Sequence, residues 1–269
     1  MDPRLAVNRQ NWNERVPVHA ASDFYGMDRF KAGAITLNDI EREEVGPVAG
    51  KNLLHLQCHF GMDTMSWSRL GARATGVDFS DAAIALAREL STELELDTRF
   101  VCSNVYDLPD ALDEQFDVVY TASGVLVWLP DLTEWATVAA RFLKPGGTFY
   151  LFEGHPLCHI FADDDSLNDS ELRVRNPYFP NPAGTRYGAN GYSYAGNETI
   201  PSPSYEWRHS MAEIVNALLD AGLRLQFLHE FPFSNYRALP GMTRCRDGWF
   251  RLPEHHDSIP QMFSLKATR

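Results

Sequence analysis

The stretch "NLLHLQCHFG" (residues 52–61) decides the fold of this chain. Its first six residues form a short apolar run that predicts a buried strand, and "MDTMSWSRLG" (62–71) can follow as a helix. Enzymes that bind nucleotides open with such a strand and helix and usually place a glycine-rich turn between them. Here the turn holds only Gly61, so the first question is whether it still binds a ligand.

Strands and helices alternate beyond this point. We expect strands at 52–57, 72–79, 98–104, 116–123 and 148–154, and helices at 80–94 and 131–143. Ser80 is a good N-cap, Asp131 and Glu134 have capping-box spacing, and "KPGG" (144–147) stops the second helix. This alternation predicts an α/β, Rossmann-like fold with a mostly parallel sheet and helices on both faces.

The flanking segments complete the expected organisation. Residues 1–45 predict an N-terminal helical cap, and 46–269 predict one domain built on the sheet. Within that domain, 155–208 is too rich in Asn, Pro, Gly and Tyr for a plain connection, so we interpret it as an inserted lid or substrate segment. The pattern resumes with a helix at 210–223 and closing strands at 224–231 and 261–267.

Composition narrows the class of protein. The formal net charge of −12 argues against nucleic acid as a partner. The chain has no apolar run of membrane-spanning length, and its first residues lack the apolar core of a signal peptide. No two of its four cysteines have C-x-x-C spacing. We therefore expect a cytoplasmic protein away from the membrane. The acidic stretch "ADDDSLNDSE" (162–171) predicts a solvated loop, and we expect no bound metal.

A dinucleotide site is disfavoured at the first turn. The three glycine positions of a G-x-G-x-x-G turn are occupied by Gln57, His59 and Met62, whose side chains would crowd a pyrophosphate. A nucleoside ligand without phosphates does not need the backbone of this turn to approach so closely.

Residues 50–153 resemble a class I S-adenosylmethionine-dependent methyltransferase of the small-molecule type. The resemblance rests on the order of five motifs, which are "LLHLQCHFG", "GVDFS", "FVCSNVYDLP", "FDVVYTASGVLVWLPD" and "LKPGGTFYLFE". The first motif departs from the family, because His55 stands where Asp is common and Gln57 and His59 stand where Gly is common.

The resemblance implies a cofactor site at the carboxyl ends of the strands. Asp78 would accept hydrogen bonds from both ribose hydroxyls. Ser80, two residues later at the same strand end, would also belong to the cofactor site. The adenine would be bounded by Phe79, Asn104 and Val105. The methionine end would be lined by Gln57, His59, Thr121 and Ser123, with Gly61 letting the main chain pass close to the cofactor.

The implied reaction is in-line transfer of the S-adenosylmethionine methyl group to a small-molecule acceptor, for which positioning supplies most of the catalysis. A base is needed only if the nucleophile carries a proton, and the candidates are His155, Tyr25 and His209, with Glu153 at a strand end. The many aromatic residues outside the motifs favour a planar or aromatic acceptor.

Two other functions stay open from the sequence. The unusual turn would also suit a non-catalytic Rossmann-like binding protein, and the fold would suit a nucleotide-dependent oxidoreductase. We expect a monomer or a homodimer.

Overall fold

The central sheet determines where everything else lies. The computed structural model describes residues 2–161, 172–196, 198–254 and 257–269. Within those residues the main sheet has seven strands in the order β10-β13-β5-β4-β1-β2-β3. Their bounds are β1 (Asn52–Leu56), β2 (Arg73–Asp78), β3 (Arg99–Cys102), β4 (Phe116–Ala122), β5 (Leu143–Gly154), β10 (Arg224–Phe231) and β13 (Met262–Thr268). Only β13 runs antiparallel to its neighbours, so the predicted mostly parallel sheet is confirmed.

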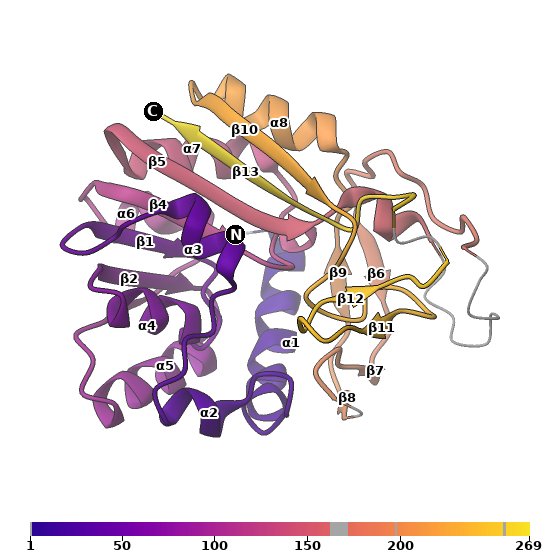
Figure 1. Cartoon of the computed structure of the whole chain (residues 1–269), viewed down its shortest axis with the longest axis horizontal. Coiled ribbons are helices and arrows are strands. Elements are labelled where there is room, and N and C mark those ends of the chain that lie inside the picture. The colour runs from indigo at the N-terminus through magenta and orange to yellow at the C-terminus, as the bar shows by residue number, and fades with distance from the viewer. Residues whose placement is uncertain (1, 162–171, 197, 255–256) are drawn as a thin grey trace.

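Helices cover both faces of the sheet, as predicted (Figure 1). Their bounds are α4 (Met62–Arg69), α5 (Asp81–Glu93), α6 (Leu108–Ala111), α7 (Leu132–Phe142) and α8 (Met211–Asp220). Side chains of β1 alternate between the faces, since Leu53 joins a core with Trp67 of α4 whereas Leu54 and Leu56 join a core with Trp135 of α7. The strand is therefore buried on both sides, as its continuous apolar run indicated.

Side-chain caps start three of these helices, α5, α7 and α8, and at α8 Ser210 Oγ accepts from the Glu213 N–H at 3.2 Å. Ser80 Oγ accepts from the Ala83 N–H at 3.0 Å at the start of α5, and Asp131 Oδ1 accepts from the Glu134 N–H at 2.9 Å at the start of α7. These bonds satisfy N–H groups that have no partner inside the helix. The predicted caps are therefore correct.

The expected start of the fifth strand is wrong by five residues. The structure begins β5 at Leu143, directly after α7, and the pairing with β4 shifts register between Phe116 and Val118. The segment "KPGG" thus ends the helix, as expected, but continues as an irregular part of the strand. Two glycines let the backbone turn there without a side-chain clash.

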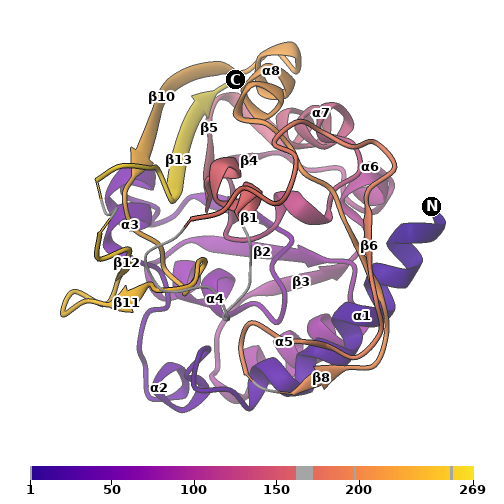
Figure 2. The ribbon, with the colours of Figure 1, turned by 90° about the vertical axis from the view of Figure 1, so that its right-hand side faces the viewer.

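The N-terminal helices and the inserted segment meet at one end of the sheet. The N-terminal helices are α1 (Pro3–Ala20), α2 (Met27–Lys31) and α3 (Asp39–Val45). The insertion contains η3 (Pro156–Ile160), β6 (Thr185–Tyr187), β7 (Gly191–Tyr192), β8 (Thr199–Ile200) and β9 (Ser204–Glu206), with β6 paired to β9 and β7 to β8. Figure 2 shows α1 beside β6 and β8. The acidic stretch 162–171 lies outside the described residues.

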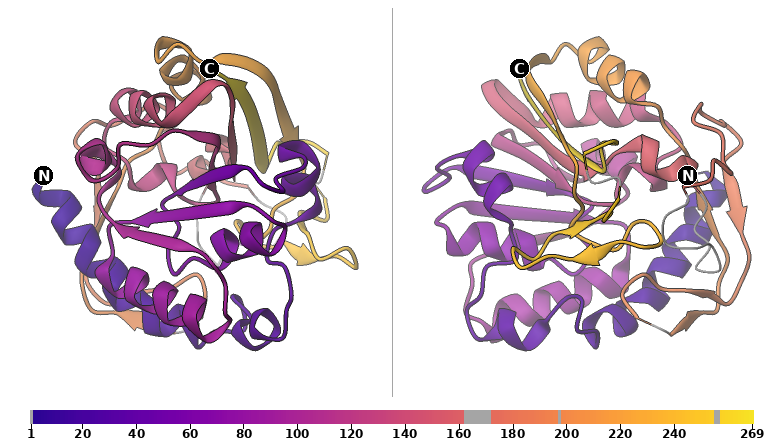
Figure 3. Two further views of the ribbon diagram at one scale, coloured as in Figure 1. Left: turned by 90° about the vertical axis from the view of Figure 1, so that its left-hand side faces the viewer. Right: turned by 45° about the vertical axis from the view of Figure 1, so that its right-hand side comes forward.

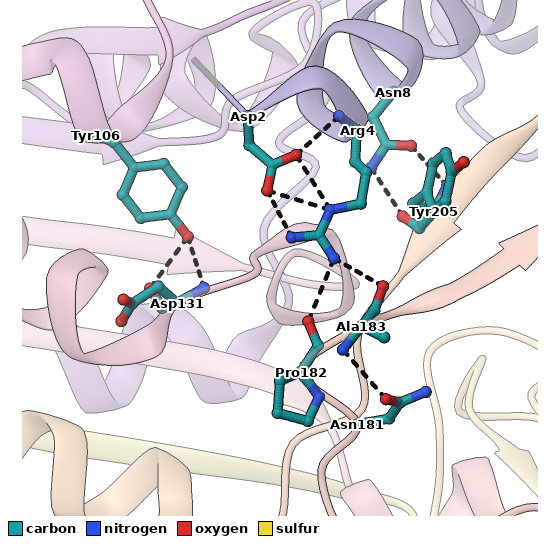
Figure 4. A network of polar contacts seen from close by, with 9 residues as sticks. All are labelled: Asp2, Arg4, Asn8, Tyr106, Asp131, Asn181, Pro182, Ala183 and Tyr205. Atoms are coloured by element: carbon teal, nitrogen blue, oxygen red, sulfur yellow. Dashed lines mark hydrogen bonds and ion pairs between the residues drawn. The ribbon is translucent and has the colours of Figure 1, made fainter.

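Hydrogen bonds join α1 to this insertion (Figure 4). The Asn8 amide donates from Nδ2 to the Tyr205 carbonyl and accepts from the Tyr205 N–H, both at 2.7 Å. One turn earlier, Arg4 pairs with Asp2 and donates from Nη1 to the Ala183 carbonyl at 2.7 Å. Helix and insertion therefore form one layer across the carboxyl ends of the parallel strands (Figure 1).

A segment before the last strand adds a small satellite core. It carries β11 (Thr243–Arg244) and β12 (Phe250–Arg251), which pair as a hairpin on the outside of the molecule (Figure 3). Leu239, Met242 and Leu252 of this segment pack with Cys158 of η3. Among the described residues, no helix combines the length and apolar character needed to cross a membrane.

Replacing Asn8 should weaken the attachment of α1 to the insertion. The variant Asn8→Ala leaves both polar groups of the Tyr205 backbone without their partner, and we expect the free energy of unfolding to fall by about 1–3 kcal/mol. Gln10→Ala is the matched control, because exposed Gln10 on the same helix bonds only Glu14 among the described residues. Equal stability of the two variants in urea titrations would contradict this role of Asn8.

Candidate active site

The turn after β1 has the backbone of a glycine turn but carries side chains. Gln57 and His59 adopt left-handed φ values of 58° and 51°, and Gly61 has φ 77°. A non-glycine residue in this region costs about 1–2 kcal/mol. Two hydrogen bonds offset that cost, from the Cys58 N–H to the Val77 carbonyl at 2.9 Å and from the His59 N–H to Asp78 Oδ2 at 2.8 Å.

Asp78 holds the turn from the end of β2. Its carboxylate is buried, and besides the His59 N–H it accepts from the Ser80 N–H at 2.9 Å through Oδ1. Burial raises the pKa of Asp78 to about 6, although these backbone N–H groups lower it in part. A carboxylate has about four lone-pair positions, and the backbone N–H groups of His59, Phe79 and Ser80 do not use all of them, so Asp78 can still accept from a ligand hydroxyl.

Gly61 has a packing role in this structure. A Cβ built at this position would lie 2.3 Å from the Phe100 ring and 3.2 Å from the Ala87 side chain. The close approach in this structure thus involves β3 and α5, and the approach of Gly61 to the cofactor stays a prediction.

The remaining residues expected near the adenine differ in burial and in whether their hydrogen-bonding groups are already used by the protein. Phe79 is half-buried, and Asn104 accepts from the Tyr106 N–H at 3.4 Å as the cap of η1 (Val105–Asp107). Val105 packs in the main core. The fully buried Ser80 hydroxyl caps α5 and donates to Asn13 Oδ1 at 2.6 Å, so it is occupied by the protein itself.

Residues expected at the methionine end lie near the end of β4 or in the loops after β1 and β4. Gln57 Nε2 donates to the Val125 carbonyl at 3.2 Å, which joins the two loops, while its buried Oε1 has no hydrogen-bond partner among the described residues. Ser123 Oγ accepts from Asn235 Nδ2 at 3.1 Å. Thr121 is fully buried and donates to the Leu56 carbonyl at 3.2 Å, so it braces the sheet.

Glu153 also has a structural role. Its buried carboxylate accepts from the N–H groups of Gly124, Val125, Leu126 and Gly154 at 2.6–3.2 Å. Burial raises the pKa of Glu153, and these four donors oppose the rise. The carboxylate therefore fixes the loop after β4.

The two histidines proposed as bases have protein partners. His155 accepts from the Leu157 N–H at 3.1 Å through Nδ1, so its Nε2 carries the proton and donates to Glu230 at 2.9 Å. His209 Nε2 donates to the Leu129 carbonyl at 2.9 Å, and its Nδ1 lies 3.2 Å from Glu213 Oε2. The His155 ring would have to release the Leu157 N–H before its Nδ1 could accept a proton, whereas His209 Nδ1 accepts no hydrogen bond from the described residues.

An aromatic cover lies over His59 and joins the cap, the turn and the insertion. It consists of Trp12, His19, Tyr25, Trp128 and Tyr194. The Trp12 ring meets the His59 ring edge to face at 5.0 Å between centroids, and the Tyr25 ring stacks on His19 at 5.1 Å. The Tyr25 and Tyr194 hydroxyls are 2.5 Å apart. Of the three proposed bases, Tyr25 is the one that the structure brings to the turn.

His19 links the turn to the insertion. Its Nδ1 lies 2.9 Å from His59 Nε2 and its Nε2 lies 2.8 Å from Ser193 Oγ. Burial lowers the pKa of His19 to about 3 and that of His59 well below its usual value, with the nearby Arg15 adding to both effects. Both rings are therefore neutral at pH 7, and His59 keeps a buried Nδ1 with no partner among the described residues.

Neither His19 nor Arg15 of α1 is among the site residues predicted from the sequence. The signal in the sequence is the spacing of Asn8, Asn11, Arg15 and His19, which recur every three or four residues and so share one face of a helix. The structure buries that face. A buried polar face on a helix indicates that the helix binds something polar.

Comparison with known proteins finds a likeness over the central part of the chain. Residues 54–151 match a family model described as "Methyltransferase domain". A relative named "Ubiquinone biosynthesis O-methyltransferase" from Alkalilimnicola ehrlichii is 32% identical over 120 residues, which are 44% of this chain and 48% of the relative. Its namesake from Pseudomonas aeruginosa is 30% identical over 124 residues, or 45% and 52% of the two chains. The chain thus spans about half the length of these relatives.

Solved structures extend the likeness of fold over more of the chain. An S-adenosylmethionine-dependent methyltransferase from Mesorhizobium loti has a TM-score of 0.57 at 19% identity, covering 89% of this chain and all of that one. A geranyl diphosphate C-methyltransferase from Streptomyces coelicolor, in complex with Mg²⁺, geranyl diphosphate and S-adenosylhomocysteine, has a TM-score of 0.52 at 18% identity. It covers 84% of this chain and 77% of that one.

The packing role of Gly61 can be measured against a second glycine of similar φ. Gly50 has φ 75° but open space where a Cβ would stand. We expect Gly50→Ala to lower the free energy of unfolding by about 1–2 kcal/mol from backbone strain alone. Gly61→Ala should add about 1–3 kcal/mol from the clash with Phe100. Equal losses in denaturant titrations would show that Phe100 makes room.

Proposed function

We propose that this chain, whose residues 54–151 match the methyltransferase family model, transfers the methyl group of S-adenosylmethionine to a small-molecule acceptor. The observation that carries the proposal is the retained glycine-type turn, in which the His59 N–H donates to Asp78 at 2.8 Å. It leaves carboxylate lone pairs for a ribose at the position where this family binds one.

The cofactor would lie along the carboxyl ends of β4, β1, β2 and β3. Asp78 would accept from the ribose hydroxyls, and the adenine would rest between Phe79 and Val105 with Asn104 at its edge. At the other end, the buried Gln57 Oε1 has no partner in the described parts of the chain and is suited to the ammonium group of the methionine part. Gly61 supports the turn from beneath through its contact with β3, and Thr121 and Ser80 brace it.

In the reaction, the chain would hold the acceptor's nucleophile in line with the methyl group and would exclude water. Transfer is an in-line displacement at the methyl carbon, and holding a nucleophile at near-attack distance can supply about 7–11 kcal/mol. The rings of the aromatic cover would also attract the cationic sulfonium through their faces. Tyr25 would orient the acceptor as a neutral hydroxyl, because burial raises its pKa well above the usual value.

The acceptor we propose is a planar or aromatic small molecule. The aromatic cover supports this choice, and the name of the ubiquinone-pathway relatives agrees with it. We further propose that the chain works as a monomer or homodimer in the cytoplasm. All four cysteines are free, which suits a reducing compartment.

The first test is calorimetric titration with S-adenosylhomocysteine, with NAD and NADP as controls. We expect micromolar binding of S-adenosylhomocysteine alone. Asp78→Ala should then weaken that binding by about 1.5–3 kcal/mol, the scale of a lost hydrogen bond to a charged group. Binding of NAD instead would favour an oxidoreductase, and binding of none of the three would contradict the proposal.

The raised pKa of Asp78 predicts that cofactor affinity depends on pH. The ionised carboxylate accepts from the ribose hydroxyls, so affinity is complete above the pKa of about 6 and is lost as the pH falls through it. With about one tenth of the carboxylate ionised at pH 5, the dissociation constant should be about tenfold larger there than at pH 8. Nearby His19 does not titrate in this range, since burial lowers its pKa to about 3.

Asp78→Asn is the matched control for this experiment. The amide does not ionise, so binding in this variant should be weaker but independent of pH. An unchanged pH profile in Asp78→Asn would assign the titration to another group.

A further inference from the structure

Arg15 is a buried cation that forms no ion pair with the part of the chain that the structure describes. It is 8% exposed on α1, and its Nε donates to Asn11 Oδ1 at 2.7 Å. Among the described residues that is the one side-chain hydrogen bond of its guanidinium, and no carboxylate lies within 4.0 Å of it. Glu206 acts on it only electrostatically from beyond that distance. Four of the five guanidinium N–H groups are therefore unassigned within the described protein.

The guanidinium is held in place. Its central carbon lies 5.5 Å from the Trp12 ring centroid and 5.6 Å from that of Trp128. Asn11, which accepts from Arg15, is itself fixed because its Nδ2 donates to the Ser202 carbonyl at 2.9 Å. Two aromatic faces and a fixed amide thus restrict the arginine to one orientation, which favours binding of a planar anion.

Arg15 lies beside the proposed cofactor site. Trp12 contacts the His59 ring, and Trp128 belongs to η2 (Leu126–Trp128), which follows β4. Gln57 joins these same two loops through the Val125 carbonyl. Arg15 therefore lies against the junction of the β1 and β4 loops, where a methyl donor and its acceptor would have to meet.

An unpaired buried charge is unfavourable, and proteins normally neutralise it with a partner. Resting on the proposed function, we propose that Arg15 binds a ligand carboxylate at the junction of donor and acceptor. The fork of a guanidinium matches a carboxylate with two parallel hydrogen bonds. The carboxylate belongs either to the methionine part of the cofactor or to the acceptor, and the two sources can be told apart.

The test compares Arg15→Met with Arg9→Met. Arg9 lies on the same helix but forms an exposed pair with Asp81 at 3.1 Å. Each variant is titrated with S-adenosylhomocysteine and with 5′-methylthioadenosine, which lacks the amino-acid part. Each is also titrated with benzoate in the presence of saturating S-adenosylhomocysteine, with benzyl alcohol as the uncharged control.

If the cofactor supplies the carboxylate, Arg15→Met should weaken S-adenosylhomocysteine binding at least tenfold and leave 5′-methylthioadenosine unchanged. If the acceptor supplies it, both cofactor analogues should bind normally while benzoate binding is lost. Arg15→Lys should recover only part of the lost affinity, because an ammonium group lacks the fork. Arg9→Met should behave as wild type.

The proposal is overturned if Arg15→Met binds S-adenosylhomocysteine and benzoate as the wild type does. It is also overturned if this variant melts well below wild type, since the guanidinium would then be a structural group. Removal of an unpaired buried charge should leave the melting temperature unchanged or higher. A wild type that binds neither cofactor analogue would instead contradict the proposed function.

Discussion

The hydrogen bond from the His59 N–H to the Asp78 carboxylate is the constraint on which the site depends. It joins the loops after β1 and β2 and keeps His59 in a left-handed conformation that glycine would adopt at less cost. Once the backbone is fixed this way, the His59 side chain projects into the aromatic cover and meets His19 and Trp12. The side chains that replace glycine in this turn thus connect the sheet to the N-terminal helix.

The N-terminal helix belongs to the site because its buried face is polar. Asn8 and Asn11 bond backbone groups of the insertion, and this places Arg15 and His19 against the turn. The insertion contributes Ser193 to the same network. Segments far apart in the sequence thus form one layer over the ends of the strands, and the chemistry of that layer differs from that of the sheet beneath it.

The sequence predicted the sheet well because local patterns determine it. Apolar runs located β1 to β4, and polar caps located the starts of α5 and α7. Because Gln57 follows β1 and Asp78 ends β2, the predicted strand ends correctly located both residues at the turn after β1. The sequence could not separate a free polar side chain from one used by the protein, because that depends on tertiary contacts. Thr121 and Glu153 look available in the sequence, but the folded protein uses their hydrogen-bonding groups.

The most direct test of the central claim is a crystal structure of the protein with S-adenosylhomocysteine. The account predicts ribose hydroxyls within hydrogen-bonding distance of Asp78, with the turn at 57–61 unchanged and the His59 N–H still donating to the same carboxylate. A cofactor bound elsewhere, or a turn that loses the bond to Asp78 when the ligand binds, would contradict it.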